Sequence, residues 1–148
     1  MISFDSNVLV YAVDRDVGDR HGRATDLIER AIRAGSCIQP LQTLCEFFAV
    51  ATRKMGMDPR AAAAFAVGWQ AVIQVEPPII DDLAAAMRVV RDHGLPFWDA
   101  MLWATIRRIG VDLLMSEDFQ DGRILEGVRF VNPFVAHNDA LIDRELPP

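Results

Sequence analysis

The chain has 148 residues, of which 51% are hydrophobic, and its 21 acidic and 15 basic residues give a net charge of −6. This length suits one domain with its own core, and the composition excludes a disordered chain. The negative charge argues against a protein that coats nucleic acid through a basic surface. No apolar stretch approaches the roughly 20 residues needed to cross a bilayer. The N-terminus shows no secretory pattern, so we expect a cytoplasmic protein.

The first half of the chain alternates apolar strand segments with helical patterns, the order typical of an α/β fold with a parallel sheet. Gly35 ends the first helical pattern, because glycine readily adopts the left-handed conformation found after helices. Asp58 and Pro59 begin another helix, as an N-cap followed by proline in the first turn. In chain order, we expect a strand at 2–4, a helix over 19–34, a strand at 37–38 and a helix over 41–55.

The second half continues this alternation and ends in a polar segment. Asp81 or Asp82 is expected to cap a helix that Gly94 closes. The other expected elements are a strand at 72–75, a helix from 96 to about 109, a strand at 111–115 and a strand at 128–131. No internal repeat or linker divides the chain. We therefore predict a single domain over residues 1–134 and a polar C-terminal tail, 135–148, whose last residues are mobile.

Four acidic residues lie inside or at the ends of apolar segments, where a protein core does not ordinarily hold a charge. Carboxylates are rarely buried unless they are paired, hydrogen-bonded or bound to a cation. The sequence has no matching set of basic residues in apolar segments. A shared cation is therefore expected, and all-oxygen ligands favour Mg²⁺ or Mn²⁺. The four acids are Asp5, Glu46, Asp99 and Asp118.

The expected topology allows these acids to meet, since the reactive crevice of an open α/β sheet lies beyond the carboxyl ends of its strands. Asp5 directly follows the first strand, and Asp118 follows the strand at 111–115 by three residues. Asp99 lies in the first turn of its helix, and Glu46, in mid-helix, has a longer side chain. Simpler interpretations stay open, because Asp99 also suits the positive end of a helix dipole and Asp118 also suits a turn.

The segments around these acids resemble the motifs of PIN-domain ribonucleases. Phe4-Asp5-Ser6-Asn7-Val8-Leu9-Val10-Tyr11-Ala12 is similar to the opening of that family. The family's other acidic motifs are matched, in the family's order, by Leu44-Cys45-Glu46-Phe47-Phe48, Phe97-Trp98-Asp99-Ala100 and Ser116-Glu117-Asp118-Phe119. The resemblance extends from residue 2 to about residue 134. The chain's size is similar to that of VapC-like toxins of bacterial toxin–antitoxin pairs.

This resemblance implies a PIN-like fold, with a central, mostly parallel β-sheet flanked by helices. It also implies a Mg²⁺- or Mn²⁺-dependent endoribonuclease, usually a homodimer and often silenced by an antitoxin protein. Cleavage of the RNA would leave a 3′-hydroxyl and a 5′-phosphate. The four acids match the family's acidic positions. We predict that Asp5 and Asp99 bind metal directly and that Glu46 and Asp118 complete the site.

Other polar residues of the same segments are candidates for supporting roles. Asn7 matches a polar position beside the first acid and Ser116 a hydroxyl position before the last, and both are expected to orient ligands or water. Glu117 and Asp121 are close enough in sequence to assist Asp118 or to replace it. Four arginines near the first and last motifs either contact RNA phosphates or are ordinary solvated charges. They are Arg15, Arg20, Arg23 and Arg123.

Two pairs of residues outside these motifs have simple structural interpretations. Phe65 and Trp69 lie four residues apart on an expected helix, where they belong either to the core or to a groove for a partner helix. Cys37 and Cys45 lie in apolar segments and are expected to be buried free thiols.

Two other classes of function compete with a nuclease. A PIN-like module that binds RNA or a partner protein without cutting it would suit the acidic charge, but it would have little need for four acids in apolar segments. A haloacid-dehalogenase-like phosphatase or a receiver domain needs an essential lysine beside its acids, and Lys54 is the chain's only lysine. The sequence therefore favours metal-dependent cleavage of RNA.

Overall fold

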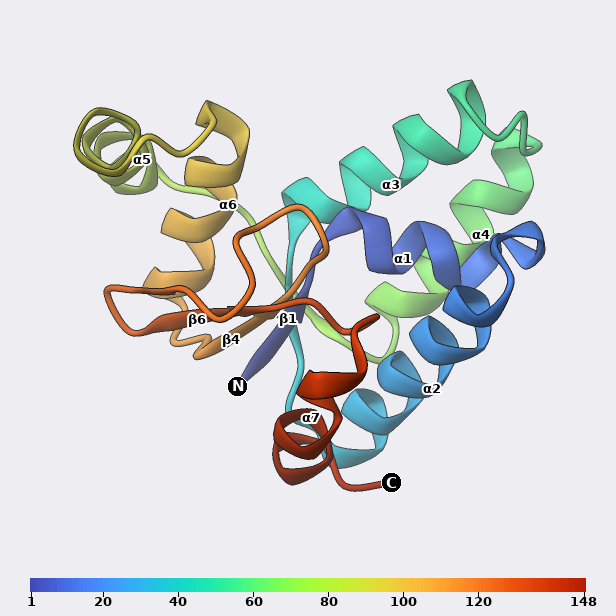
Figure 1. Cartoon of the computed structure of the whole chain (residues 1–148). Helices are drawn as coiled ribbons and strands as arrows, with labels where there is room; N and C mark the ends of the chain where they lie inside the picture. Colours follow the sequence, from blue (N-terminus) through green and yellow to red (C-terminus); the bar gives the residue numbers. More distant parts are fainter.

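The computed structural model describes residues 1–148, and its strands and helices alternate through most of the chain (Figure 1). The strands are β1 (Ile2–Phe4), β2 (Ile38–Pro40), β3 (Gln74–Glu76), β4 (Leu113–Met115), β5 (Ile124–Leu125) and β6 (Val128–Val131). The helices are α1 (Ser6–Val13), α2 (Asp19–Ala34), α3 (Leu41–Arg53), α4 (Pro59–Gln70), α5 (Ile80–His93), α6 (Phe97–Arg108) and α7 (Asp139–Glu145). Two 3₁₀ turns, η1 (Arg15–Val17) and η2 (Ala136–Asn138), precede α2 and α7. No helix is both long and apolar enough to span a membrane.

Four strands form the central sheet, in the order β1-β4-β6-β5. β1, β4 and β6 are parallel, whereas β5 pairs antiparallel with β6. β2 and β3 form a second parallel pair, which a single bridge between Ile2 and Cys37 joins to β1. Phe4 is in register with Met115, and Met115 with Val131. The carboxyl ends of the three parallel strands therefore lie at the same level.

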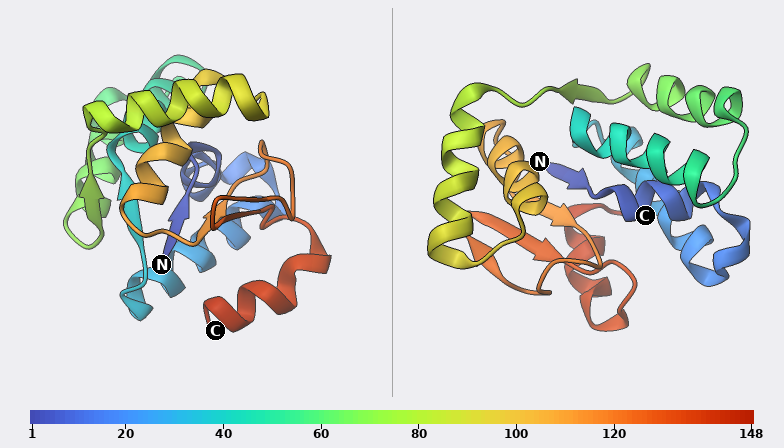
Figure 2. Two further views of the ribbon diagram at one scale, coloured as in Figure 1. Left: turned by 90° about the vertical axis from the view of Figure 1, so that its left-hand side faces the viewer. Right: turned by 90° about the horizontal axis from the view of Figure 1, so that it is seen from above.

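Helices cover both faces of this sheet, and each face has its own hydrophobic core. α5 and α6 lie on one side of the strands, and α1 to α4 lie on the other (Figures 1 and 2). Side chains alternate along β4, so that Leu113 and Met115 belong to the core on the α1–α4 side and Leu114 to the core on the α5–α6 side. A sheet buried on both faces is the arrangement expected of parallel strands.

The predicted α/β fold with a central, mostly parallel sheet is confirmed, and most predicted elements are present with small shifts at their ends. α2 has the predicted bounds, and Gly35 follows it in the left-handed conformation, with φ of 59°. Asp58 caps α4 by accepting a hydrogen bond from the backbone N–H of Arg60 at 3.0 Å. The third strand begins two residues later than expected, because the chain continues in a turn after α4 and the N–H of Ile73 donates to the carbonyl of Trp69.

The predicted cap of α5 is wrong in position. The helix begins at Ile80, so Asp81 and Asp82 both lie within its first turn. Asp82 nevertheless provides a hydrogen-bond acceptor at the start of the helix, since its carboxylate accepts from the backbone N–H of Ile79 at 2.9 Å. Arg108 of α6 also donates to this carboxylate at 2.9 Å. An acid inside the first turn therefore caps the helix and links it to α6.

Of the two cysteines, one is buried and one is exposed, and of the aromatic residues Phe65 and Trp69 only Trp69 packs against the core. Cys37 is buried as expected, but Cys45 is exposed, because it lies on the outward face of α3. Trp69 packs against the buried ring of Phe47, with ring centroids 4.9 Å apart. Phe65 keeps 44% of its surface exposed. The periodicity that marked these positions as apolar did not determine which of them face the core.

Two helices were not predicted, and the expected polar tail contains one of them. The residues of α1 after Asn7 are almost all apolar, so they show no helical alternation of polar and apolar positions. Residues 135–148 form η2 and α7, and Ile142 and Leu146 are fully buried in the core on the α1–α4 side. Ile142 and Leu146, four residues apart, mark a short helical face, and Leu141 packs beside them, but the polar residues around them hide this pattern in the sequence.

Two arginines of α2 hold this C-terminal segment in place. Arg23 donates to the carbonyl of Pro133 at 3.2 Å and to the Asp139 carboxylate at 2.7 Å. Arg30, which is 3% exposed, pairs with Asp143 at 2.7 Å and also donates to the carbonyl of Leu146. The seven-residue spacing places both guanidinium groups on one face of α2, two turns apart. Residues 135–148 are therefore packed against the domain by both apolar burial and charge pairing.

Replacing Leu146 by Ala tests this packing. We expect the variant to lose about 2–4 kcal/mol of unfolding free energy in urea titrations, since a fully buried leucine leaves a cavity when it is truncated. Leu41→Ala, at a leucine that is 37% exposed, is the matched control and should cost less than about 1 kcal/mol. Equal stability of the two variants would contradict the buried position of Leu146.

Candidate active site

The site is built where β1 and β4 end side by side. The backbone N–H of Asp5 donates to the carbonyl of Met115 at 3.0 Å, which continues the parallel pairing past the last residue of β1. Directly across, the Ser116 hydroxyl donates to the Asp5 carboxylate at 2.6 Å. Both residues are buried, with Asp5 6% exposed. The predicted meeting of the first and last motifs at the strand ends is therefore present in the structure.

Asn7, in the first turn of α1, connects these two motifs. Its side-chain amide nitrogen lies 3.0 Å from a carboxylate oxygen of Asp118, 3.3 Å from the Ser116 hydroxyl and 3.4 Å from Asp5. Its Oδ1 atom is buried and has no hydrogen-bond partner. The backbone N–H of Asp118 donates to the Ser116 hydroxyl at 3.1 Å. Asn7 and Ser116 therefore both orient the acids beside them.

The four acids lie close enough to influence one another's ionisation. Burial raises the pKa of Asp5 from 3.8 to about 6; hydrogen bonds from Ser116 and Ser6 oppose this rise, and the charges of Glu46 and Asp118 add to it. Burial also raises the pKa of Asp99, and the charges of Asp118 and then Glu46 contribute. None of the four forms a salt bridge with a basic side chain. The site is therefore a concentration of uncompensated negative charge.

Two glutamines that were not predicted from the sequence support this cluster. Gln39 is buried in the middle of β2, and its side-chain amide bonds to the backbone N–H and carbonyl of Phe4 and to the Thr43 hydroxyl. It thereby fixes the end of β1 directly before Asp5. Gln42, on α3, donates to Glu46 at 2.8 Å. The apolar neighbours of Gln39 in the sequence, Ile38 and Pro40, were the available signal that its amide is buried.

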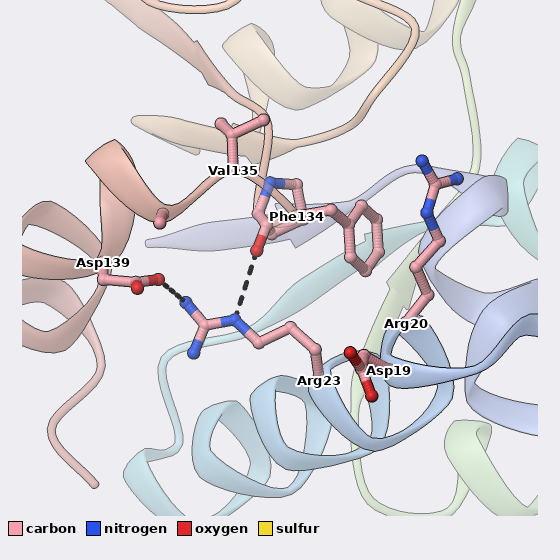
Figure 3. A pocket seen from close by; sticks show the side chains of 8 residues that line it. Asp19, Arg20, Arg23, Phe134, Val135 and Asp139 are labelled. Carbon is pink, nitrogen blue, oxygen red and sulfur yellow. Dashed lines mark hydrogen bonds and ion pairs between the residues drawn. The ribbon is translucent and has the colours of Figure 1, made fainter.

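Glu117 points away from the four acids and into a second cluster. The hydroxyl of Tyr11 donates to the Glu117 carboxylate, and Arg20 pairs with the same carboxylate at 2.7 Å. The Arg20 guanidinium also lies 5.1 Å from the centre of the Tyr11 ring and 5.4 Å from that of Phe134. Figure 3 shows Arg20 and Phe134 at the edge of a neighbouring pocket. Glu117 therefore anchors the loop that carries Ser116 and Asp118, and nothing in its contacts makes it a substitute for Asp118.

Asp121 and three of the candidate arginines also lie outside the cluster. Asp121 accepts hydrogen bonds from the N–H of Asn132 and the side chain of Asn138, each at 2.8 Å, and it contacts His137. Arg23 lines the pocket of Figure 3, where its guanidinium is paired with Asp139. Arg15 lies in η1 and Arg123 directly precedes β5; neither forms a salt bridge. Asp121 and Arg23 thus have partners other than the four acids, and neither Arg15 nor Arg123 pairs with any of the four.

The donor set suits a hard divalent cation. The available groups are carboxylate, amide and hydroxyl oxygens, which are the ligands that Mg²⁺ and Mn²⁺ prefer. The orphaned Asn7 oxygen and the buried carboxylate of Asp5 are both acceptors that a cation or its water shell would satisfy. In their present rotamers, no three acidic, histidine or cysteine side chains are arranged to hold a metal ion. The residue chemistry fits a cation, whereas the side-chain positions do not yet enclose one.

Comparison with known families assigns this fold and motif order. The family model described as PIN domain matches residues 2–121. The chain belongs to the PIN domain family. The matched range contains all four acids, and the predicted resemblance is confirmed. The comparison with curated proteins gives no match.

Solved structures with the same PIN fold include three from toxin–antitoxin systems. VapC20 of Mycobacterium tuberculosis, described as a toxin that cleaves the sarcin-ricin loop, is 23% identical, with a TM-score of 0.63 over 80% of this PIN domain chain and 92% of its own. A chain of a toxin–antitoxin complex from Klebsiella pneumoniae is 19% identical, with a TM-score of 0.62 over 90% of this chain and 98% of its own. DNA-bound VapBC from Salmonella typhimurium is 12% identical, with a TM-score of 0.66 over 89% of this chain and 97% of its own. At these identities the likeness establishes the fold.

The raised pKa of Asp5 predicts a pH-dependent stability of the metal-free protein. Because the folded-state pKa, about 6, is above the unfolded-state value of 3.8, ionising Asp5 above about pH 6 costs the folded state free energy, and this cost is absent below about pH 4. Asp5→Asn removes the charge. In EDTA near pH 8, we expect the variant to exceed the parent's unfolding free energy by about 1–3 kcal/mol, with the advantage disappearing towards pH 4.

Urea titrations from about pH 4 to about pH 8 would measure this difference. Asp16→Asn is the control, since Asp16 is exposed and its carboxylate makes no hydrogen bond. A pH-independent difference between the parent and Asp5→Asn would contradict the assignment of Asp5 as a buried, uncompensated acid.

Proposed function

We propose that this PIN domain protein is a Mg²⁺- or Mn²⁺-dependent endoribonuclease that acts as the toxin of a toxin–antitoxin pair. The observation that carries the proposal is the buried carboxylate of Asp5, which faces further acids at the carboxyl ends of parallel strands and has no basic partner. Keeping such a group ionised at neutral pH costs free energy unless a cation compensates it. A structural role alone gives no reason for that cost.

The proposed roles follow from the contacts of each residue. Asp5 and Asp99 would hold the cation, with Glu46 and Asp118 turning towards it to complete the site. Ser116, which donates to Asp5, keeps one carboxylate oxygen in a fixed direction. Gln42 holds Glu46 on the side of the site that faces α6. A bound divalent ion would supply activation of the attacking water and neutralisation of charge on the phosphoryl oxygens.

The neighbouring structures support the biological part of the proposal. VapC20 is described as a toxin that cleaves the sarcin-ricin loop, and two further neighbours come from toxin–antitoxin complexes. On that basis we expect an antitoxin protein as partner. The homodimer stays a prediction from the resemblance to the PIN family. The chain's net charge of −6 also favours a defined RNA target over nonspecific coating of nucleic acid.

One observation favours the alternative of a non-catalytic PIN-like module that binds RNA or protein. The acids in their present rotamers do not enclose a metal ion. A module of this kind would leave the charge of Asp5 uncompensated in every state. Metal binding and RNA cleavage therefore separate the two functions.

We expect Mn²⁺ to raise the melting temperature of the parent protein and to support cleavage of a mixture of structured RNAs, with both effects absent in EDTA. Asp99→Asn should reduce cleavage by at least about 100-fold, because it removes a proposed ligand of the ion. The rise in melting temperature with Mn²⁺ should shrink in the same variant. Asp16→Asn should behave as the parent in both assays.

Two results would count against this function. Cleavage by Asp99→Asn at the parent's rate would remove Asp99 from the mechanism. A parent protein that gains no stability from Mn²⁺ and cuts no RNA would support the non-catalytic binding module instead.

A further inference from the structure

A small pocket adjoins the four-acid site, between α3 and the start of α6. Its volume is about 360 Å³, and its walls are mostly apolar. Four of its residues lie at spacings of three or four along α3 and therefore share one face of that helix. The lining residues are Gln42, Cys45, Glu46, Ala49 and Trp98. Because Glu46 belongs both to this pocket and to the acid cluster, the two sites are continuous.

An exposed tryptophan forms one wall of this pocket. Trp98 keeps 64% of its surface exposed, and it directly precedes Asp99 in the sequence. The ring of Phe97 packs against the indole edge to face, with centroids 5.2 Å apart and an interplanar angle of 64°. Gln42 donates to the backbone carbonyl of Trp98 at 3.0 Å. The structure therefore holds a large aromatic surface open to solvent beside one of the proposed metal ligands.

The charge around the site limits how RNA can be held there. The chain carries a net charge of −6, and four acids are concentrated at the strand ends. Of the four candidate arginines, Arg20 pairs with Glu117 and Arg23 with Asp139, whereas Arg15 and Arg123 form no salt bridge. These ion pairs reduce the positive charge available to RNA phosphates. With part of the positive charge paired and four acids at the site, neutral contacts gain weight, and stacking on aromatic side chains is the main neutral contact available to unpaired bases.

We infer that this pocket is a subsite for an unpaired nucleobase of the RNA strand whose backbone lies at the four-acid site. The inference rests on the nuclease function proposed above and assigns part of its substrate binding. The base stacks on the indole of Trp98, which every nucleobase can do through its flat face. Gln42 uses its amide nitrogen to bond Glu46 and Trp98, so its Oε1 atom is free to accept a hydrogen bond from the base edge.

The pocket suits a base better than it suits a second protein chain. An apolar helix seated here would cover the Glu46 carboxylate and remove it from water without a compensating partner. A pocket of five lining residues is also far smaller than the roughly 800 Å² per partner that a stable protein interface buries. A nucleotide places an apolar ring in the pocket and leaves its charged phosphate at the cation site.

The test is RNA affinity measured separately from cleavage. Fluorescein-labelled oligouridylate and oligoadenylate are titrated with protein, with Ca²⁺ in place of Mg²⁺ and the RNA checked on a gel to confirm that it stays intact. We expect Trp98→Ala to weaken binding roughly 5- to 100-fold and Trp98→Phe to keep most of it, because the phenyl ring can still stack. Phe65→Ala, at another exposed aromatic on α4, is the matched control and should bind as the parent does.

Cys45 provides a second readout within the pocket. Burial raises the pKa of the other thiol, Cys37, to about 12, so a thiol-reactive dye will label Cys45 almost exclusively. We expect oligoadenylate to slow this labelling in the parent and in Phe65→Ala but not in Trp98→Ala. An abasic strand of the same length should not protect Cys45 in any of these proteins.

Three outcomes would overturn the subsite. They are RNA binding by Trp98→Ala as tight as that of the parent, no binding of either oligonucleotide by the parent, and protection of Cys45 without RNA in a dimer that Trp98→Ala dissociates. The last would identify a second copy of the chain as the occupant. The Mn²⁺-dependent melting temperature and the cleavage of structured RNA are measured on the same variants. If Trp98→Ala keeps RNA affinity while the parent still binds Mn²⁺ and cleaves, only the subsite fails and the nuclease stands.

Discussion

The buried carboxylate of Asp5 is the constraint on which the rest of the site depends. Its backbone continues the pairing of β1 with β4, so its position is fixed by the sheet. Its side chain is held by a hydroxyl from the neighbouring strand end, and no basic group offsets its charge. A parallel sheet covered on both faces supplies such a location at low cost, because the strand ends are the only part of the sheet where polar groups meet without disturbing either core.

Around this carboxylate, neutral amides perform the positioning that ion pairs perform elsewhere in the chain. Gln39 replaces a missing backbone partner at the end of β1, and Gln42 joins α3 to the start of α6. The basic residues are used further out, where Arg20 holds Glu117 and Arg30 holds α7. This division keeps cationic side chains away from the acids, which leaves the compensation of their charge to a bound ion.

The parts of the fold that follow from local pattern could be predicted, and those that follow from contacts between distant polar residues could not. Strand β1 with Asp5, and β4 with Ser116, are recognisable because an apolar run ends in a polar residue. Helix α1 lacks such a contrast, and α7 is a seven-residue helix with few apolar positions, so neither was found. The orientation of Glu117 depends on Tyr11, more than a hundred residues away, which no spacing rule reveals.

The C-terminal helix also determines when the domain can form during synthesis. Ile142 and Leu146 complete a core whose other members belong mostly to the first half of the chain. The ion pairs that hold them join residues 113 and 116 positions apart. Helices α1 to α4 therefore leave the ribosome with part of their apolar surface uncovered, and this core closes only after residue 146 has emerged. A nascent chain stopped before that point would present an incomplete core to the cell's chaperones and proteases.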